Sequence, residues 1–149
     1  MAMQRMFERS FDSLPSIVAF TADVFARERI DSGLRPVIDL AIEELFTNMV
    51  KYGGGSTADV RIEIGRIDRG VEVTLIDYDV ERFDVTATPD VDVNLPIEQR
   101  KPGGLGLHLI RRLLDSLEYD YNEAIRQSRI TFRKTQAAQE GAVHTTKGG

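Results

Sequence analysis

The sequence predicts an α+β two-layer sandwich, in which helices cover one face of a mixed, mostly antiparallel sheet. Two observations carry this prediction. Helical and strand patterns do not alternate regularly along the chain, which excludes a doubly wound parallel sheet. In addition, residues 60–65 and 71–75 alternate apolar with polar side chains, as strands do when one face of their sheet is buried and the other is wet.

The first half of the chain is expected to form a short strand and two helices. Residues 3–9 are weakly strand-like. Ser13–Pro15 is typical of a helix start, with Ser13 as the N-cap and the proline in the first turn, and apolar residues then recur at helical spacing. A second helix is expected to begin around Leu34–Pro36 and to stop at the glycines after Tyr52.

The second half is expected to form two hairpins, separated by a long loop and a third helix. Asp68–Gly70 turns the first hairpin, and the periodicity then disappears from Asp79 to Pro102, which indicates a functional or disordered loop. Apolar residues from 107 to 117 mark the third helix, and the closing hairpin follows at 118–134. Residues 1–134 are therefore predicted to be one domain, and the polar tail at 135–149 is expected to be disordered.

The composition excludes several classes of function. The chain has 149 residues, a formal net charge of −5 and no cysteine, so disulfides and thiolate metal sites are impossible. With two histidines a zinc site is not expected, and without a basic stripe direct nucleic-acid binding is not expected either. No apolar run approaches the roughly 20 residues of a membrane span, and no signal-peptide core is found, so a cytoplasmic protein without membrane contact is expected.

A carboxylate and an amide share one face of the second expected helix. Glu44 and Asn48 are four residues apart, which places them one turn apart on the same face. An amide oxygen is a suitable magnesium ligand, and a carboxylate can accept a proton from a hydroxyl nucleophile. The alternative is a solvated pair without a ligand. Lys51, one turn beyond Asn48, suits either a phosphate or the negative end of the helix dipole.

Two further segments supply groups that suit a nucleotide. Asp77 ends a strand pattern, where its carboxylate can accept a hydrogen bond from an exocyclic amine or can be an ordinary turn residue. Gly103–Gly106 opens the third helix. Its glycines let the backbone approach a ligand, and the helix start offers free N–H groups, which together suit phosphate. The alternative is a flexible hinge into the helix.

Together these segments resemble the histidine-kinase-like ATPase superfamily, also called the GHKL or Bergerat-fold ATPases. Within it the chain looks like the small anti-sigma-factor serine kinases of bacterial partner-switching systems. Residues 41–52 (AIEELFTNMVKY) look like the N box, residues 75–84 (LIDYDVERFD) like a divergent G1 box, and residues 102–110 (PGGLGLHLI) like the G2 box. The G2 segment is the most specific of the three, and the resemblance covers residues 7–134.

The resemblance implies a role for each matching residue. Glu44 would be the general base that activates a serine hydroxyl on a partner protein, Asn48 would bind Mg²⁺, and Asp77 would bind the adenine amine. Residues 79–102 would act as an ATP lid. The other nucleotide-binding residues would be Lys51, Gly103, Gly104, Leu105, Gly106, Leu107 and Ser128.

The resemblance also implies an activity and partners. The protein would use ATP and Mg²⁺ as a protein-serine kinase, would sequester a sigma factor and would phosphorylate a small STAS-domain antagonist; homodimers are common in the family. One position departs from the pattern, because the family usually carries glycine where this chain has Asp79. Bulk and charge there would weaken binding of an anionic nucleotide or re-route the lid. The alternative function is therefore a kinase-inactive partner-binding module with weak or structural nucleotide binding, and a third is an ATPase that acts on no protein.

Overall fold

The computed structural model describes residues 2–87 and 104–137. Within these residues the chain forms five strands, three α-helices and two short 3-10 turns. Their order is β1 (Ala2–Phe7), η1 (Phe11–Ser13), α1 (Leu14–Arg27), η2 (Ser32–Leu34), α2 (Arg35–Tyr52), β2 (Val60–Ile67), β3 (Gly70–Tyr78), α3 (Gly104–Leu113), β4 (Ser116–Asn122) and β5 (Gln127–Thr135).

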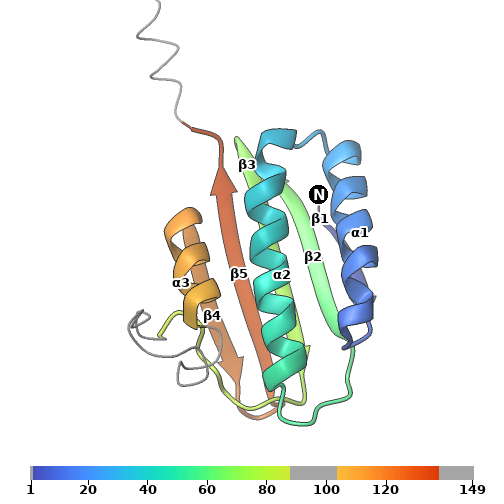
Figure 1. Cartoon of the computed structure of the whole chain (residues 1–149), viewed down its shortest axis with the longest axis vertical. Coiled ribbons are helices and arrows are strands. Elements are labelled where there is room, and N and C mark those ends of the chain that lie inside the picture. The colour runs from blue at the N-terminus through green and yellow to red at the C-terminus, as the bar shows by residue number, and fades with distance from the viewer. Residues whose placement is uncertain (1, 88–103, 138–149) are drawn as a thin grey trace, which may run out of the picture.

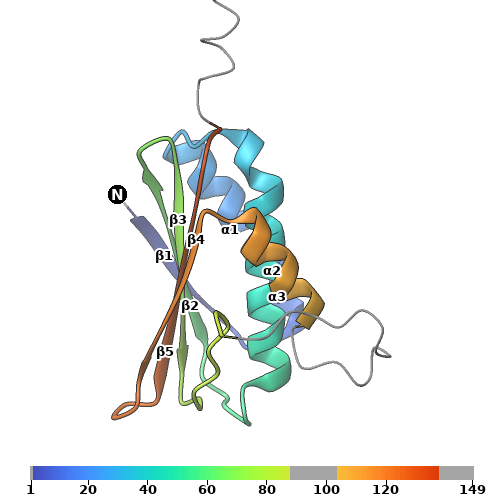
Figure 2. The same cartoon turned by 90° about the vertical axis from the view of Figure 1, so that its left-hand side faces the viewer.

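The described strands form one sheet in the order β1-β2-β3-β5-β4, and each neighbouring pair is antiparallel. Figures 1 and 2 show all three α-helices on one face of this sheet, with α2 between α1 and α3. The predicted two-layer α+β sandwich is confirmed. It differs from the prediction in that no parallel pair occurs among the described strands.

The hydrophobic core lies between the sheet and the helices. Burying each large apolar side chain there contributes about 1.5–3 kcal/mol relative to leaving it in water. Leu107 and Ile110 belong to this core, so packing fixes α3 beside α2. The largest fully buried members are Phe20, Phe46, Phe132, Ile38, Ile42, Leu45, Ile62, Ile64, Leu75, Leu107 and Ile110.

The start of α1 differs from the prediction. Ser13 occupies the N-cap position, but its side chain makes no capping hydrogen bond; its Oγ donates to the Glu8 carbonyl at 2.7 Å. Ser10 takes the capping role one turn earlier, where its Oγ accepts from the Asp12 N–H at 3.1 Å. The chain therefore enters α1 through the 3-10 turn η1.

Two predicted element ends also need correction. The third helix ends at Leu113, and Leu117 lies in β4, where it packs against the same core. The first strand ends at Phe7 and does not reach Arg9. Arg9 therefore lies in the connection between β1 and η1, from which its side chain turns toward the ends of α2 and β3.

The described part of the expected lid, residues 79–87, contains neither helix nor strand. Two tyrosines of β4 hold it to the sheet: Tyr119 Oη accepts from the Phe83 N–H at 2.9 Å, and Tyr121 Oη donates to the Val80 carbonyl at 2.6 Å. Residues 88–102 of this expected lid, and most of the tail predicted to be disordered, lie outside the described residues. None of the helices in 2–87 and 104–137 has the length and apolar character that crossing a bilayer requires.

Candidate functional site

A cleft lies where α2 and β3 end, and three residues singled out in the sequence line it. Asn48 comes from α2, Asp77 from the end of β3 and Ser128 from the start of β5. Asp77 and Ser128 are register partners on neighbouring strands. A cleft with mainly apolar walls and few polar groups is typical of a small-molecule site. Its apolar and aromatic walls are Leu45, Met49, Tyr52, Val80, Phe83, Val85, Tyr119 and Ile130.

The amide of Asn48 has an unsatisfied hydrogen-bonding group on the wall of this cleft. Asn48 is buried, and its Nδ2 is the one buried side-chain nitrogen or oxygen that lacks a hydrogen-bond partner in the described part of the chain. Leaving a buried polar group unpaired costs about 1–3 kcal/mol. Rotation about the last side-chain bond exchanges the amide oxygen and nitrogen, so either atom can be presented to a ligand.

This amide fits a magnesium–nucleotide complex. An amide oxygen is a neutral, hard ligand, and Mg²⁺ is usually held by one or two protein groups together with substrate phosphates. In residues 2–87 and 104–137 no group of three or more His, Cys, Asp or Glu side chains could hold a metal ion. Asn48 and the phosphates of a nucleotide are therefore a better match to this site than a carboxylate cage.

Glu44 lies one turn before Asn48 on α2 and faces α3. Its carboxylate occupies the space beside Gly106: a Cβ at residue 106 would overlap Oε2 and Cδ of Glu44 and come within 2.9 Å of Oε1. Glu44 can hold this position only because residue 106 is glycine. The structure thus brings together the N-box carboxylate and a glycine of the G2 segment, and it places both at the N-terminal turn of α3.

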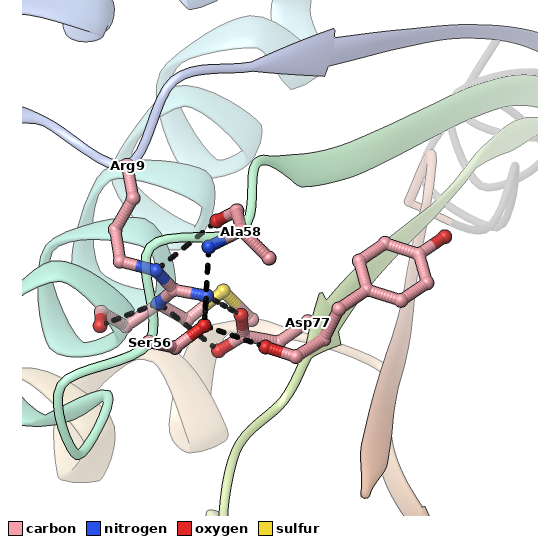
Figure 3. Close-up of polar contacts among 6 residues, drawn as sticks. Arg9, Ser56, Ala58 and Asp77 are labelled. Carbon is pink, nitrogen blue, oxygen red and sulfur yellow. Dashed lines mark hydrogen bonds and ion pairs between the residues drawn. The ribbon is translucent and has the colours of Figure 1, made fainter. Parts of the chain in front are cut away.

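Asp77 forms a buried ion pair with Arg9, a residue that is not among the predicted site residues. The Nη2 of Arg9 donates to Oδ1 of Asp77, and its Nη1 lies 3.5 Å from Oδ2 (Figure 3). The same guanidinium donates to the carbonyl of Met49 at 2.9 Å, the carbonyl of Ala58 at 3.2 Å and the hydroxyl of Ser56 at 3.3 Å. Arg9 therefore ties the end of α2 and the start of β2 to the end of β3.

The environment of Asp77 contains opposing electrostatic effects. Burial raises the pKa of its carboxyl above the ordinary value for an aspartate, whereas the hydrogen bond and positive charge of Arg9 and the backbone N–H of Tyr78 lower it.

One signal in the sequence could have indicated that Asp77 has a buried cationic partner. Asp77 ends an apolar strand, and a carboxylate that becomes fully buried requires a cation or several donors.

The side chain of Asp79 lies outside the cleft. Its backbone has φ of +56°, in the left-handed region that favours glycine and that aspartate adopts more readily than most residues. The side chain is 71% exposed and pairs with Arg126, whose Nε lies 3.3 Å from Oδ1. The requirement for glycine at this position is therefore a backbone requirement, and the Asp79 carboxylate does not fill the space beside Asn48 and Asp77.

The other predicted site residues fall into three groups. Lys51 is exposed on the last turn of α2 and is not part of the cleft wall. Gly104 and Leu105 begin α3, whereas the Leu107 side chain is fully buried in the core, so Leu107 offers a ligand only its backbone. Gly103 lies outside the described residues.

The chain belongs to the histidine kinase-like ATPase family, because the profile of that domain matches residues 7–134. No curated protein matches the chain in sequence.

Two solved structures share the fold. The RsbU and RsbW domains of Rv1364c from Mycobacterium tuberculosis match with a TM-score of 0.62 at 13% identity, over 93% of this chain and 34% of that chain. The SiaB–SiaC complex from Pseudomonas aeruginosa matches with a TM-score of 0.56 at 16% identity, over 90% of this chain and 89% of that chain. This chain therefore spans about a third of the first of these chains, and at such identities the likeness concerns the fold.

Proposed function

We propose that this protein is an ATP-dependent protein-serine kinase of a partner-switching system, which also sequesters a sigma factor. Its substrate would be a serine of a small STAS-domain antagonist. The observation that carries the proposal is the contact of Glu44 with Gly106 between α2 and α3, one helical turn from Asn48, which lines a cleft together with Asp77. Family membership supports nucleotide binding, and one structure of similar fold is a complex of two proteins, SiaB with SiaC.

The nucleotide would lie with its base in the cleft and its phosphates toward the start of α3. The exocyclic amine of adenine would donate to Asp77, beside Ser128. The phosphates would meet the free N–H groups and the positive dipole end of α3. Mg²⁺, when bound, would neutralise phosphate charge, and the Asn48 amide oxygen is the protein group that fits it.

Glu44 would act on the protein substrate. Its carboxylate would accept the proton of the serine hydroxyl while the serine oxygen forms a bond to the γ-phosphorus. The bond from that phosphorus to the bridging β–γ oxygen breaks, which yields phosphoserine and ADP. Phosphoryl transfer requires mainly positioning and charge neutralisation from the protein, and the contact between Glu44 and Gly106 positions this base at the helix start.

The test is transfer of labelled γ-phosphate to a STAS-domain protein that binds this chain. Glu44→Gln is expected to abolish transfer while Mg-ADP binding, measured by titration calorimetry, is retained. Glu43→Gln is the matched control, because Glu43 is the neighbouring carboxylate and is exposed on α2. Transfer at the normal rate by Glu44→Gln would remove the assigned base, and a wild-type chain that binds no nucleotide would contradict the whole proposal.

The alternative is a kinase-inactive partner-binding module. The argument for it is that Asp79 would crowd the nucleotide, but the Asp79 side chain points to solvent and to Arg126, which weakens that argument. Partner binding without any phosphate transfer would favour this alternative. Homodimer formation remains a prediction from the family resemblance.

A further inference from the structure

We infer that Arg9 determines the base specificity of the candidate nucleotide site, because it holds Asp77 as a carboxylate that only accepts hydrogen bonds. Such a group selects a base with an exocyclic amine over a base with a carbonyl oxygen at the same position. The inference rests on the proposed function, since it requires Asp77 to face the base.

Arg9 lies behind Asp77 and not in the cleft. Asp77 is part of the cleft wall, whereas Arg9 is not. The side chain of Arg9 is 7% exposed and is enclosed by the carbonyls of Met49 and Ala58 and by the Ser56 hydroxyl. Figure 3 shows the guanidinium reaching Asp77 from the connection between β1 and η1. Arg9 therefore supports the carboxylate without occupying the place of a base.

Asp77 keeps the capacity to bind a ligand while it is paired. An ionised carboxylate offers about four lone-pair positions on its two oxygens. Arg9 uses one position on each oxygen and the backbone N–H of Tyr78 uses a third, so a position remains for an N–H donor from the cleft. A carbonyl oxygen on the base would instead face a carboxylate that has no hydrogen to donate, and this mismatch disfavours its binding.

Without Arg9 the same carboxyl would behave differently. Its neighbours on the cleft wall include Met49 and Val80, which are apolar. A buried carboxyl without a cation takes up a proton and becomes a hydrogen-bond donor as well as an acceptor. It could then donate to a carbonyl oxygen, and selection between the two kinds of base would be relaxed.

The other titratable groups of the cleft cannot replace Arg9. They are Tyr52 of α2, Glu81 after β3 and Tyr119 of β4. A carboxyl and a phenol carry no positive charge in either protonation state, so none of these groups replaces the guanidinium. Within the described residues, Arg9 is the cation that pairs with Asp77.

The chain makes room for the guanidinium. Gly53, directly after α2, has φ of −75°, which any residue can adopt. A Cβ there would nevertheless lie 2.7 Å from Arg9 Nη1 and 2.6 Å from the Met49 carbonyl oxygen. Space for this guanidinium and for the carbonyl it binds, rather than backbone conformation, therefore requires glycine at position 53.

The test compares the full chain's affinities for Mg-ADP and Mg-IDP, whose bases carry an amine and a carbonyl at C6, with N1 an acceptor in the first base and an N–H donor in the second. Wild type is expected to prefer ADP by about tenfold or more between about pH 6 and pH 8. Arg9→Met is expected to lose most of this preference at the lower pH and to regain it as the pH rises and Asp77 ionises. Arg27→Met is the matched control, because Arg27 forms an exposed ion pair with Asp23.

The outcomes separate the inference from the proposed function. A folded Arg9→Met chain that keeps the wild-type preference for ADP overturns the inference alone. A folded Arg9→Met chain that binds both nucleotides more tightly, with an unchanged ratio of affinities, also overturns it, because Arg9 would then obstruct the site. Wild type that binds neither nucleotide overturns the proposed function and the inference with it. If circular dichroism shows that Arg9→Met is unfolded, Arg9→Gln takes its place, because it is neutral but can still donate to the Met49 carbonyl; a wild-type preference there overturns the inference.

Discussion

The carboxylate of Glu44 on α2 occupies the space that a Cβ at residue 106 of α3 would need. Two segments far apart in the sequence are therefore matched in shape, an acidic side chain on one helix and a glycine on the next. Because the overlapping atoms belong to the end of a flexible side chain, a larger residue at position 106 would move Glu44 rather than unfold the protein.

Gly106→Ala is accordingly expected to lower phosphotransfer more than nucleotide affinity. In the Glu44→Ala background the overlap is gone, and the same change should stabilise the chain by up to about 1 kcal/mol, because alanine is the better helix former. Urea denaturation of the four chains of this double-mutant cycle measures the coupling. An equal effect of Gly106→Ala in both backgrounds would show that the carboxylate does not lie in that space.

Removing Arg9 is expected to destabilise the fold strongly at neutral pH. Arg9→Met leaves the buried Asp77 carboxylate unpaired, and breaking a buried pair in this way costs about 3–5 kcal/mol. Arg9→Met combined with Asp77→Asn should lose less, since no unpaired charge remains. Arg27→Met, which opens an exposed pair, should cost less than about 1 kcal/mol.

The loss in Arg9→Met is also expected to depend on pH. Burial raises the pKa of Asp77, and removing Arg9 removes the group that lowers it again. A carboxyl with a raised folded-state pKa contributes stability that is present at low pH and is lost as the pH rises through that pKa. Thermal denaturation should therefore show a smaller deficit at about pH 4–5 than at neutral pH. A deficit that is constant or grows toward low pH would contradict this account.

Asn48→Ala is expected to separate stability from ligand binding. The change removes an amide nitrogen that has no partner, so the free energy of unfolding without ligand should change by less than about 1 kcal/mol. Magnesium-dependent nucleotide binding should be lost in calorimetric titrations. Thr47→Ala, at the adjacent position whose hydroxyl bonds to the Glu43 carbonyl, serves as control and should bind normally. Magnesium-dependent binding by Asn48→Ala would exclude the amide as ligand.

Asp79 offers a test of backbone against side-chain effects. Asp79→Gly should leave nucleotide affinity unchanged within about twofold, because the side chain is exposed and outside the cleft. Asp79→Ala should destabilise the chain by about 1 kcal/mol relative to Asp79→Gly, since alanine is strained at a φ of +56°. A large gain in affinity on changing Asp79 to glycine would instead show that this side chain obstructs the nucleotide.

Local signals in the sequence predict much of this fold. The proline at position 36 and the glycine at position 53 mark both ends of α2, and the alternation in β2 identifies the buried face of the sheet, whereas β3 also buries Thr74 and Ile76 on its other face. The end of α3 is not predictable in this way. Leu117 continues the apolar spacing of that helix but lies in β4. Its side chain packs against the same core that a helical residue there would contact, so the apolar pattern does not distinguish the two elements.

The candidate site is only partly predictable for a similar reason. Glu44 and Asn48 share a helix face, so their proximity follows from spacing alone. The ion pair between Arg9 and Asp77 joins residues 68 positions apart, and no local pattern indicates it. The position of the Arg9 side chain depends on the path of the connection between β1 and η1 beside the end of α2, and only the tertiary structure reveals this path.

The glycine at position 53 places a constraint on the history of this sequence. A larger residue there would overlap both the arginine at position 9 and the carbonyl of Met49, so a descendant that lost only the arginine would still be restricted to glycine by the carbonyl. The arginine can therefore be replaced while the glycine is kept, whereas a larger residue at position 53 is expected only where the arginine is gone and the end of α2 has shifted as well. The two positions form one evolutionary unit, although one precedes α1 and the other follows α2.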